Sequence, residues 1–148
     1  MPNTTISQLP AASLPLTGTE QAAVDQAGAT KRVSINQIGG QDIPQRLVTG
    51  TNDSFQIGDR GDHLYVENIA TPCTIAIPNN ATVPFPIGSV ITVAVDPASG
   101  VVTFDASAIT LLQAGTLNVG NRTLAAQGEA TFLKVKTDTW FVNGAGLT

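Results

Sequence analysis

Two side chains of this chain could act together as a nucleophile and its base. His63 is the only histidine and Cys73 the only cysteine, so counting excludes a metal site built from several His or Cys ligands. A Cys–His pair would suit covalent catalysis, but neither residue lies in a sequence typical of a catalytic turn. We therefore predict that His63 begins a strand and that Cys73, in the run CTIAIP, is an apolar strand residue.

Three carboxylates lie close together in the stretch TNDSFQIGDRGDHLYV: Asp53, Asp59 and Asp62. Paired carboxylates can hydrolyse bonds or bind calcium, but this spacing lacks the alternating oxygen ligands and closing glutamate of a calcium loop. Aspartate is also favoured at strand ends and turns because it hydrogen-bonds nearby backbone. We expect the structural role, with no metal, no cofactor and no catalytic residue.

The aromatic residues offer a second alternative. They could form a platform on which carbohydrate stacks, or they could fill the core. Aromatic side chains at strand positions beside Val and Ile bury a large apolar area. We therefore expect core positions for Phe85, Phe104, Phe132, Trp140 and Phe141.

The surface of this protein must carry few charges. Charged residues make up 12% of the chain, about half of the roughly 25% that is usual in soluble domains. The net charge of −4 comes without a basic stripe, so nucleic acid is not an expected partner. Neither a signal peptide nor an apolar run of membrane-spanning length is present, which predicts synthesis in the cytoplasm and no membrane partner. A surface with so few charged residues favours a subunit that is covered by its neighbours in an assembly.

The first part of the chain has the pattern of an arm followed by a hairpin. Residues 1–15 contain Pro2, Pro10 and Pro15, which favour an extended segment over a helix or sheet. The runs QAAVDQ and TKRVSI then flank a loop around Gly28, which predicts a β-hairpin. A hairpin of two strands is marginal in water and needs a surface to pack on.

From about Arg46 onward, short β-branched runs are separated by turn residues every eight to twelve positions, as in an all-β sandwich or barrel. Tight hairpin turns are expected at Asp96–Gly100 and Thr137–Thr139. The predicted fold is all-β: an N-terminal extended arm and hairpin, residues 1–45, followed by an antiparallel β-sandwich or barrel-like body, residues 46–148. The predicted strands of the body are SFQI, HLYVEN, CTIAIP, SVITVAV, VVTF, AITLL, ATFLKVK and TWFVNG.

An ordered series of motifs resembles a known family. The run GDRGDHLYVENIATPCTIAIPNNATVPFPIGSVITVAVDPASGVVTFDA, followed by FLKVKTDTWFVNGAG, is similar to the β-rich domain of bacteriophage tail-fibre and head-decoration subunits. The stretch ISQLPAASLPLTGTEQAAVDQAGATKRVSINQI resembles a short N-terminal unit of phage structural proteins. The resemblance implies a non-enzymatic virion protein that is a homotrimer.

Because the chain has one compact domain and no shaft repeat, the resemblance favours a capsid decoration, or cement, protein on the exterior of the virion. Its partners would be itself and the major capsid protein, with residues 1–45 as the docking element and the body as the trimerisation module. The alternative is a short tail fibre, or a tail or baseplate accessory protein, that binds a host receptor or surface glycan. The expected partner-binding residues are the apolar side chains of the arm and hairpin: Ile6, Leu9, Leu14, Leu16, Val33 and Ile35.

Overall fold

The computed structural model describes residues 21–26, 29–34, 43–67 and 71–148. The chain divides into two units, Met1–Asp42 and Ile43–Thr148, and each is described by itself. In the first unit, β1 (Gln21–Gln26) pairs antiparallel with β2 (Ala29–Ser34), so the predicted hairpin is confirmed in its backbone. The predicted arm, residues 1–15, lies outside the described residues.

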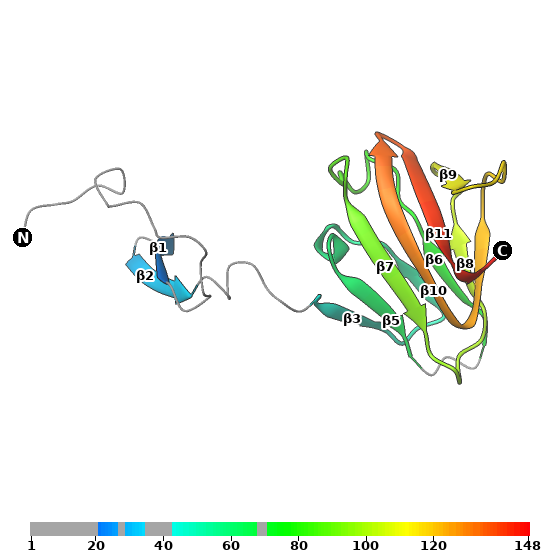
Figure 1. Cartoon of the computed structure of the whole chain (residues 1–148), viewed down its shortest axis with the longest axis horizontal. Helices are drawn as coiled ribbons and strands as arrows, with labels where there is room; N and C mark the ends of the chain where they lie inside the picture. Colours follow the sequence, from blue (N-terminus) through cyan, green and yellow to red (C-terminus); the bar gives the residue numbers. More distant parts are fainter. Residues whose placement is uncertain (1–20, 27–28, 35–42, 68–70) are drawn as a thin grey trace, which may run out of the picture. The chain divides into compact units, whose positions relative to one another are not determined.

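The first six strands of the body alternate between two groups of parallel neighbours (Figure 1). One group contains β3 (Gln45–Val48), β5 (His63–Val66) and β7 (Val90–Val95). The other contains β4 (Asn52–Ser54), β6 (Cys73–Ala76) and β8 (Val102–Asp105). Parallel neighbours cannot be joined by a tight turn. Here each crossover contains a strand of the opposite group, so the chain winds between the two.

A bent antiparallel hairpin joins the two groups. It consists of β10 (Arg122–Lys136) and β11 (Thr139–Leu147). The first residues of β10 pair with β8 and its later residues pair with β7, while β9 (Thr110–Gln113) runs parallel to β11. The result is a mixed, nearly closed, barrel-like sheet with the strand order β3-β5-β7-β10-β8-β6-β4. The body is all-β as predicted, but it is mixed and not antiparallel.

The bend of β10 lies at a register shift between Leu124 and Glu129. Gln127 has a φ of 61°, the one non-glycine residue with positive φ among those described. Opposite the shift, a Cβ at Gly144 would overlap the carbonyl oxygen of Glu129 and the Cα of Ala130. The two strands therefore approach each other at the bend more closely than any side chain at Gly144 would allow.

One predicted hairpin is confirmed and the other is wrong. The turn after Lys136 does connect the antiparallel pair β10–β11. The turn at Asp96–Gly100 also forms, with the Ser99 N–H donating to the Asp96 carbonyl at 3.0 Å. However, it connects β7 to β8, which are not neighbours in the sheet. Turn chemistry indicated where the chain reverses, but not which strands pair.

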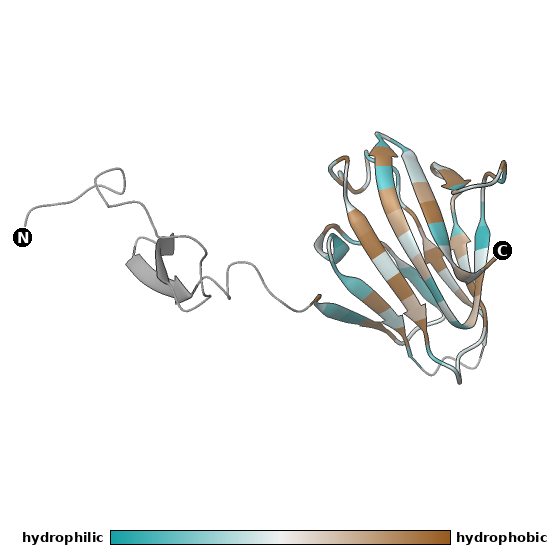
Figure 2. Cartoon of the chain, viewed as in Figure 1, coloured by the Kyte–Doolittle hydropathy of each residue, from teal (hydrophilic) through white to brown (hydrophobic). Residues whose placement is uncertain are grey.

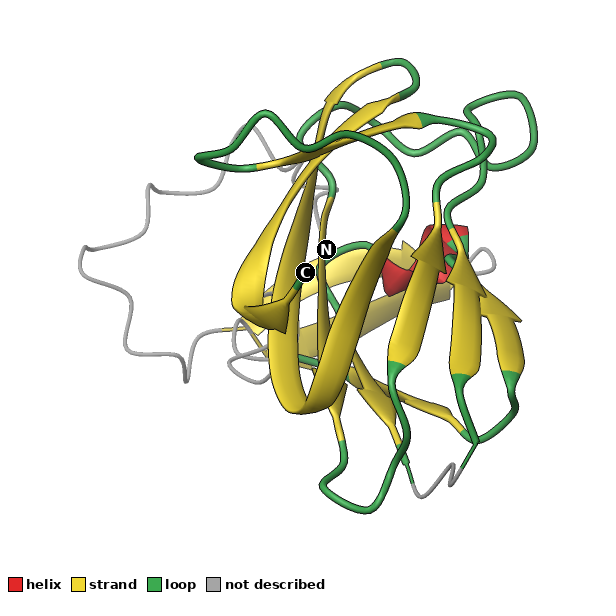
Figure 3. Ribbon diagram, turned by 90° about the vertical axis from the view of Figure 1, so that its right-hand side faces the viewer, coloured by secondary structure: helices red, strands yellow, loops and turns green. Residues whose placement is uncertain are grey.

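The core lies between the strand groups, and buried residues alternate along the strands, as in β7 and β8. Figure 2 shows this alternation as bands of hydropathy, and Figure 3 shows a body made almost entirely of strands and loops. Phe104 and Phe132 have ring centroids 4.6 Å apart, and Phe85 and Trp140 5.4 Å. These four aromatic residues are buried as predicted. The core prediction is wrong for Phe141, which is 39% exposed.

Candidate interaction surface

His63 and Cys73 do not form a nucleophile–base pair. They lie in β5 and β6, which belong to different strand groups. The Cys73 thiol is buried and donates to the Gly50 carbonyl at 3.4 Å, while the His63 Nε2 has no hydrogen-bond partner. Burial, with a smaller effect of Asp53, raises the pKa of Cys73. A thiol whose pKa is raised is a poor nucleophile near neutral pH.

Two of the three clustered carboxylates bind an arginine. The Arg46 guanidinium donates to Asp59 through Nε at 2.6 Å and Nη2 at 3.0 Å, and to Asp53 through Nη1 at 2.7 Å. Burial alone would lower the pKa of Arg46, but the hydrogen bonds to Asp59 and Asp53 raise it. Asp59 also accepts from the Gln56 N–H at 2.7 Å, at the start of the 3-10 helix η2 (Ile57–Asp59). The cluster therefore connects β3, β4 and η2.

This cluster is structural in its geometry, because the arginine occupies the carboxylate oxygens that a cation would need. Among the described residues, no group of three or more His, Cys, Asp or Glu side chains is arranged to hold a metal ion. Arg46 links β3 to β4, the two end strands of the barrel-like sheet.

Lys134 is a buried cation for which the sequence gives no prediction of burial. Its Nζ donates to Asn80 Oδ1 at 2.7 Å and to the Phe85 carbonyl at 2.8 Å, and it lies 5.9 Å from the centroid of the Trp140 ring. Burial lowers the pKa of Lys134, and the nearby Asp138 opposes this. The hydrogen bonds to Asn80 and Phe85 anchor the long loop between β6 and β7 to the end of the β10–β11 hairpin. Lys134 lies two positions after the buried Phe132 in the same strand, so both side chains point to the core face of β10.

The outer face of β9, β11, β10 and β7 carries an apolar row. The strand register places Leu133 opposite both Val90 and Phe141, and Phe141 opposite Leu112. Val90, Leu133 and Phe141 are 39%, 40% and 39% exposed. The row therefore presents apolar side chains from neighbouring strands to solvent.

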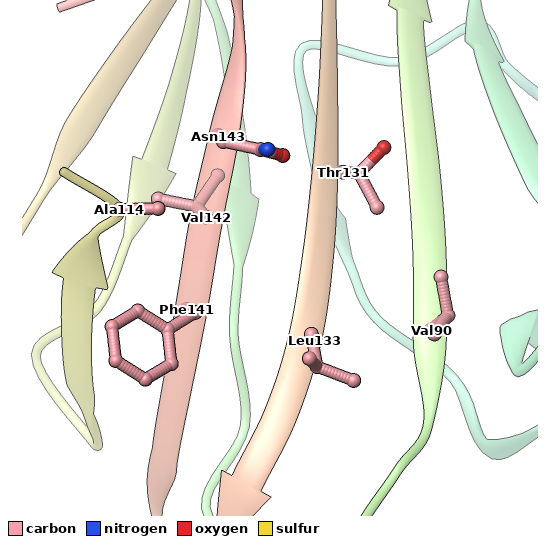
Figure 4. Close-up of a pocket in the computed structure, with 7 residues that line it drawn as sticks. All are labelled: Val90, Ala114, Thr131, Leu133, Phe141, Val142 and Asn143. Carbon is pink, nitrogen blue, oxygen red and sulfur yellow. The ribbon is translucent and has the colours of Figure 1, made fainter.

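A groove of about 360 Å³ follows this face (Figure 4). Thr131 and Asn143 lie beside the apolar row, and they also border an adjoining hollow that ends at Glu129. Of all the residues that line the two hollows, only Glu129 is charged. The groove itself is lined by Val90, Ala114, Thr131, Leu133, Phe141, Val142 and Asn143.

The sequence contains a pattern that indicates this exposed apolar surface. Phe132 and Leu133 are both apolar, as are Trp140, Phe141 and Val142. A strand that is buried on one face alternates apolar with polar residues, whereas a strand with apolar residues on both faces is typical of a sheet that is covered on both sides.

The predicted partner-binding residues lie mostly outside the described residues: Ile6, Leu9, Leu14, Leu16 and Ile35. Val33 lies in β2, where its backbone pairs with Ala22. Their predicted role in docking stays a prediction.

No protein-family model matches the chain, and no curated protein matches it. Within the part of the chain that the structure describes, no helix has both the length and the apolar character needed to cross a membrane.

Proposed function

We propose that this chain is a non-enzymatic structural subunit of a bacteriophage virion: a capsid decoration, or cement, protein that binds the assembled head as a homotrimer and stabilises it. The observation that carries the proposal is the exposed apolar row of Val90, Leu133 and Phe141 on a sheet face with almost no charge. Such a face is costly on a free monomer and is typical of a surface that another protein covers. The motif series described from the sequence supplies the virion as the setting.

The low charge of the whole chain supports a permanent assembly. In the proposal the body contacts other copies, residues 1–45 dock on the major capsid protein, and the subunit lies on the capsid exterior. A protein that binds only the assembled head stabilises it by mass action. A modest gain in stability at each contact between capsid subunits adds up over the many contacts of the shell.

A second candidate is a tail-associated protein that binds a host surface glycan. The groove favours it, because the exposed Phe141 ring lines the same hollow as the polar side chains of Asn143 and Thr131. An aromatic wall with a few placed polar groups is the usual construction of a small-ligand site.

The test uses particles of the phage that encodes the chain, prepared with and without this protein. We expect gold-labelled antibody over the whole head of complete particles. We also expect dye access to packaged DNA at a lower temperature in particles that lack the protein, with recovery after the purified protein is added. Label confined to the tail, with coincident melting curves, would favour the glycan-binding alternative. Complete particles without label would overturn the virion assignment.

A further inference from the structure

The turn between β9 and β10 holds a leucine in solvent. Leu117 is 100% exposed, yet the turn around it is closed by hydrogen bonds. The Gln113 N–H donates to the Asn118 carbonyl at 3.0 Å, and the Asn118 side-chain amide donates to Gln113 Oε1 at 3.0 Å. Thr116 Oγ1 donates to the Gln113 carbonyl at 3.1 Å and accepts from the Asn118 N–H at 3.0 Å. The turn therefore holds Leu117 in a defined position, where its side chain buries no surface against the body of its own chain.

The groove begins beside this turn. Ala114, which lines the groove, belongs to the turn, and the bridge between Leu112 and Val119 closes the base of the turn. Neither the groove lining nor residues 115–120 includes a charged residue. The body therefore carries an apolar knob, Leu117, and an apolar groove side by side.

We infer that the groove on one copy receives Leu117 from a second copy of this chain. Burial of a fully exposed leucine removes apolar surface from water on both partners. The groove volume of about 360 Å³ lies within the range of hollows that hold a ligand. Because knob and groove are both uncharged, two chains of net charge −4 can meet there without like charges in contact.

The contact joins the knob of one copy to the groove of the next, and three such contacts close a ring when the rotation between copies is threefold. A ring of three is the state expected from the proposed homotrimer. This inference rests on the self-association in the proposed function and names the surfaces that make it. It does not depend on where in the virion the protein lies.

The test uses complementary charges in the full-length chain. Leu117→Lys places a cation on the knob, and Leu133→Glu places a carboxylate in the groove. Native mass spectrometry and light scattering should show trimers for the natural protein and monomers for each single variant at the same concentration. The double variant, which carries both substitutions in one chain, should form trimers again, because every contact in its ring then joins the introduced cation to the introduced carboxylate.

Ile57→Lys is the matched control, because Ile57 is a 49% exposed apolar residue outside both surfaces. It should leave the trimer unchanged. Circular dichroism and the fluorescence of the buried Trp140 check that each variant folds, and Leu117→Lys replaces a fully exposed side chain. The inference is overturned if the natural protein is monomeric, if both single variants still form trimers, or if the double variant stays monomeric. Particle labelling needs none of these variants, so failure of the contact and failure of the virion assignment give different results.

Discussion

Leu133 of β10 lies directly opposite Phe141 of β11, and both side chains face solvent while their chain neighbours Phe132 and Trp140 are buried. The same two strands therefore supply the core on one face and an apolar surface on the other. Stability of the body requires only the first of these faces. The second is the face to which the proposed contact with another copy is assigned.

An apolar contact of this kind should be insensitive to ionic strength. We expect the fraction of trimer in the natural protein to change little between low and high sodium chloride, measured by sedimentation velocity. The double variant with Leu117→Lys and Leu133→Glu should dissociate as salt rises, because its new ion pairs are screened. Dissociation of the natural trimer by salt would indicate a contact between charges elsewhere on the chain.

The Arg46–Asp59 pair should contribute strongly to the stability of the body. Arg46→Met leaves Asp59, which is 2% exposed, buried without its counter-charge. We expect the free energy of unfolding to fall by about 2–4 kcal/mol, somewhat below the cost of breaking a fully buried pair because Arg46 is partly exposed. Urea titration measures the change. Arg60→Met removes an exposed arginine and should alter the free energy by less than about 0.5 kcal/mol; equal losses in the two variants would contradict the assigned role of the pair.

A pH-dependent contribution is expected from Tyr65 and Asp96, whose side chains form a 2.6 Å hydrogen bond. This bond is the main cause that lowers the pKa of Asp96 below its ordinary value of 3.8 and raises the pKa of Tyr65 above its ordinary value of 10.0. The stabilisation is therefore fully present between those two values. It is lost as pH falls through the lowered pKa of Asp96 or rises through the raised pKa of Tyr65.

The variant Tyr65→Phe isolates this effect. Its free energy of unfolding, subtracted from that of the natural protein, should give a plateau near neutral pH that decreases toward both extremes. Asp96→Asn removes the carboxylate and should abolish the decrease on the acidic side. A difference that stays constant at every pH would show that the hydroxyl acts through packing and not through this bond.

Gly144 should be essential to the bend of the β10–β11 hairpin. Gly144→Ala forces a methyl group against the Glu129 carbonyl and Ala130, so we expect a loss of at least about 1–3 kcal/mol, as for overpacking in a core. Gly58→Ala is the matched control, since a Cβ there meets no atom within 4 Å and φ is not positive. The comparison uses the urea midpoint of each variant. A midpoint for Gly144→Ala equal to that of the control would show that the hairpin shifts at little cost.

The sequence predicted which side chains of the strands face the core better than it predicted which strands pair. Phe104 and Phe132 are buried as predicted, because a large aromatic side chain at a strand position favours the core whichever strands lie beside it. The neighbours of a strand depend on distant segments, so the parallel pairing of β5 with β7 left no local signal. The first part of β10, RTLAAQG, was not predicted as a strand, since Ala, Gln and Gly have weak β propensity. Those residues form the bend.

The outer surface was missed for a related reason. When both faces of a strand carry apolar residues, the sequence alone does not show which face is exposed. Phe141 lies on the exposed face, which only the strand register identifies. The assignment of the five named Phe and Trp residues to the core followed from residue type, which does not distinguish the two faces of a sheet. Lys134 was overlooked because a lysine in a strand is normally exposed, and its partners in the loop after β6 are far away in the sequence.

The last prediction concerns residues 1–45, expected from the sequence to be the docking element. Every residue of the described core lies between Val48 and Leu147, so a chain that begins at Ile43 retains the whole core. We expect this truncated protein to give the same strand signal by circular dichroism and to form trimers, because the knob and groove lie within the body. It should not bind phage heads, because it lacks the hairpin, which is marginal alone and would be stabilised by packing on a partner.

A full-length variant separates loss of the segment from loss of its apolar contacts. Replacing Ile6, Leu9, Leu14 and Leu16 together by Ser keeps the length of the chain and removes the side chains expected to bind. Cosedimentation with particles that lack the protein measures binding, with the natural chain as reference. If the Ser variant loses binding to the same extent as the truncated protein, these four apolar side chains carry the attachment. Undiminished binding by the truncated protein would instead show that the body docks by itself, and the exposed face of β7, β10 and β11 would then be the surface that meets the capsid.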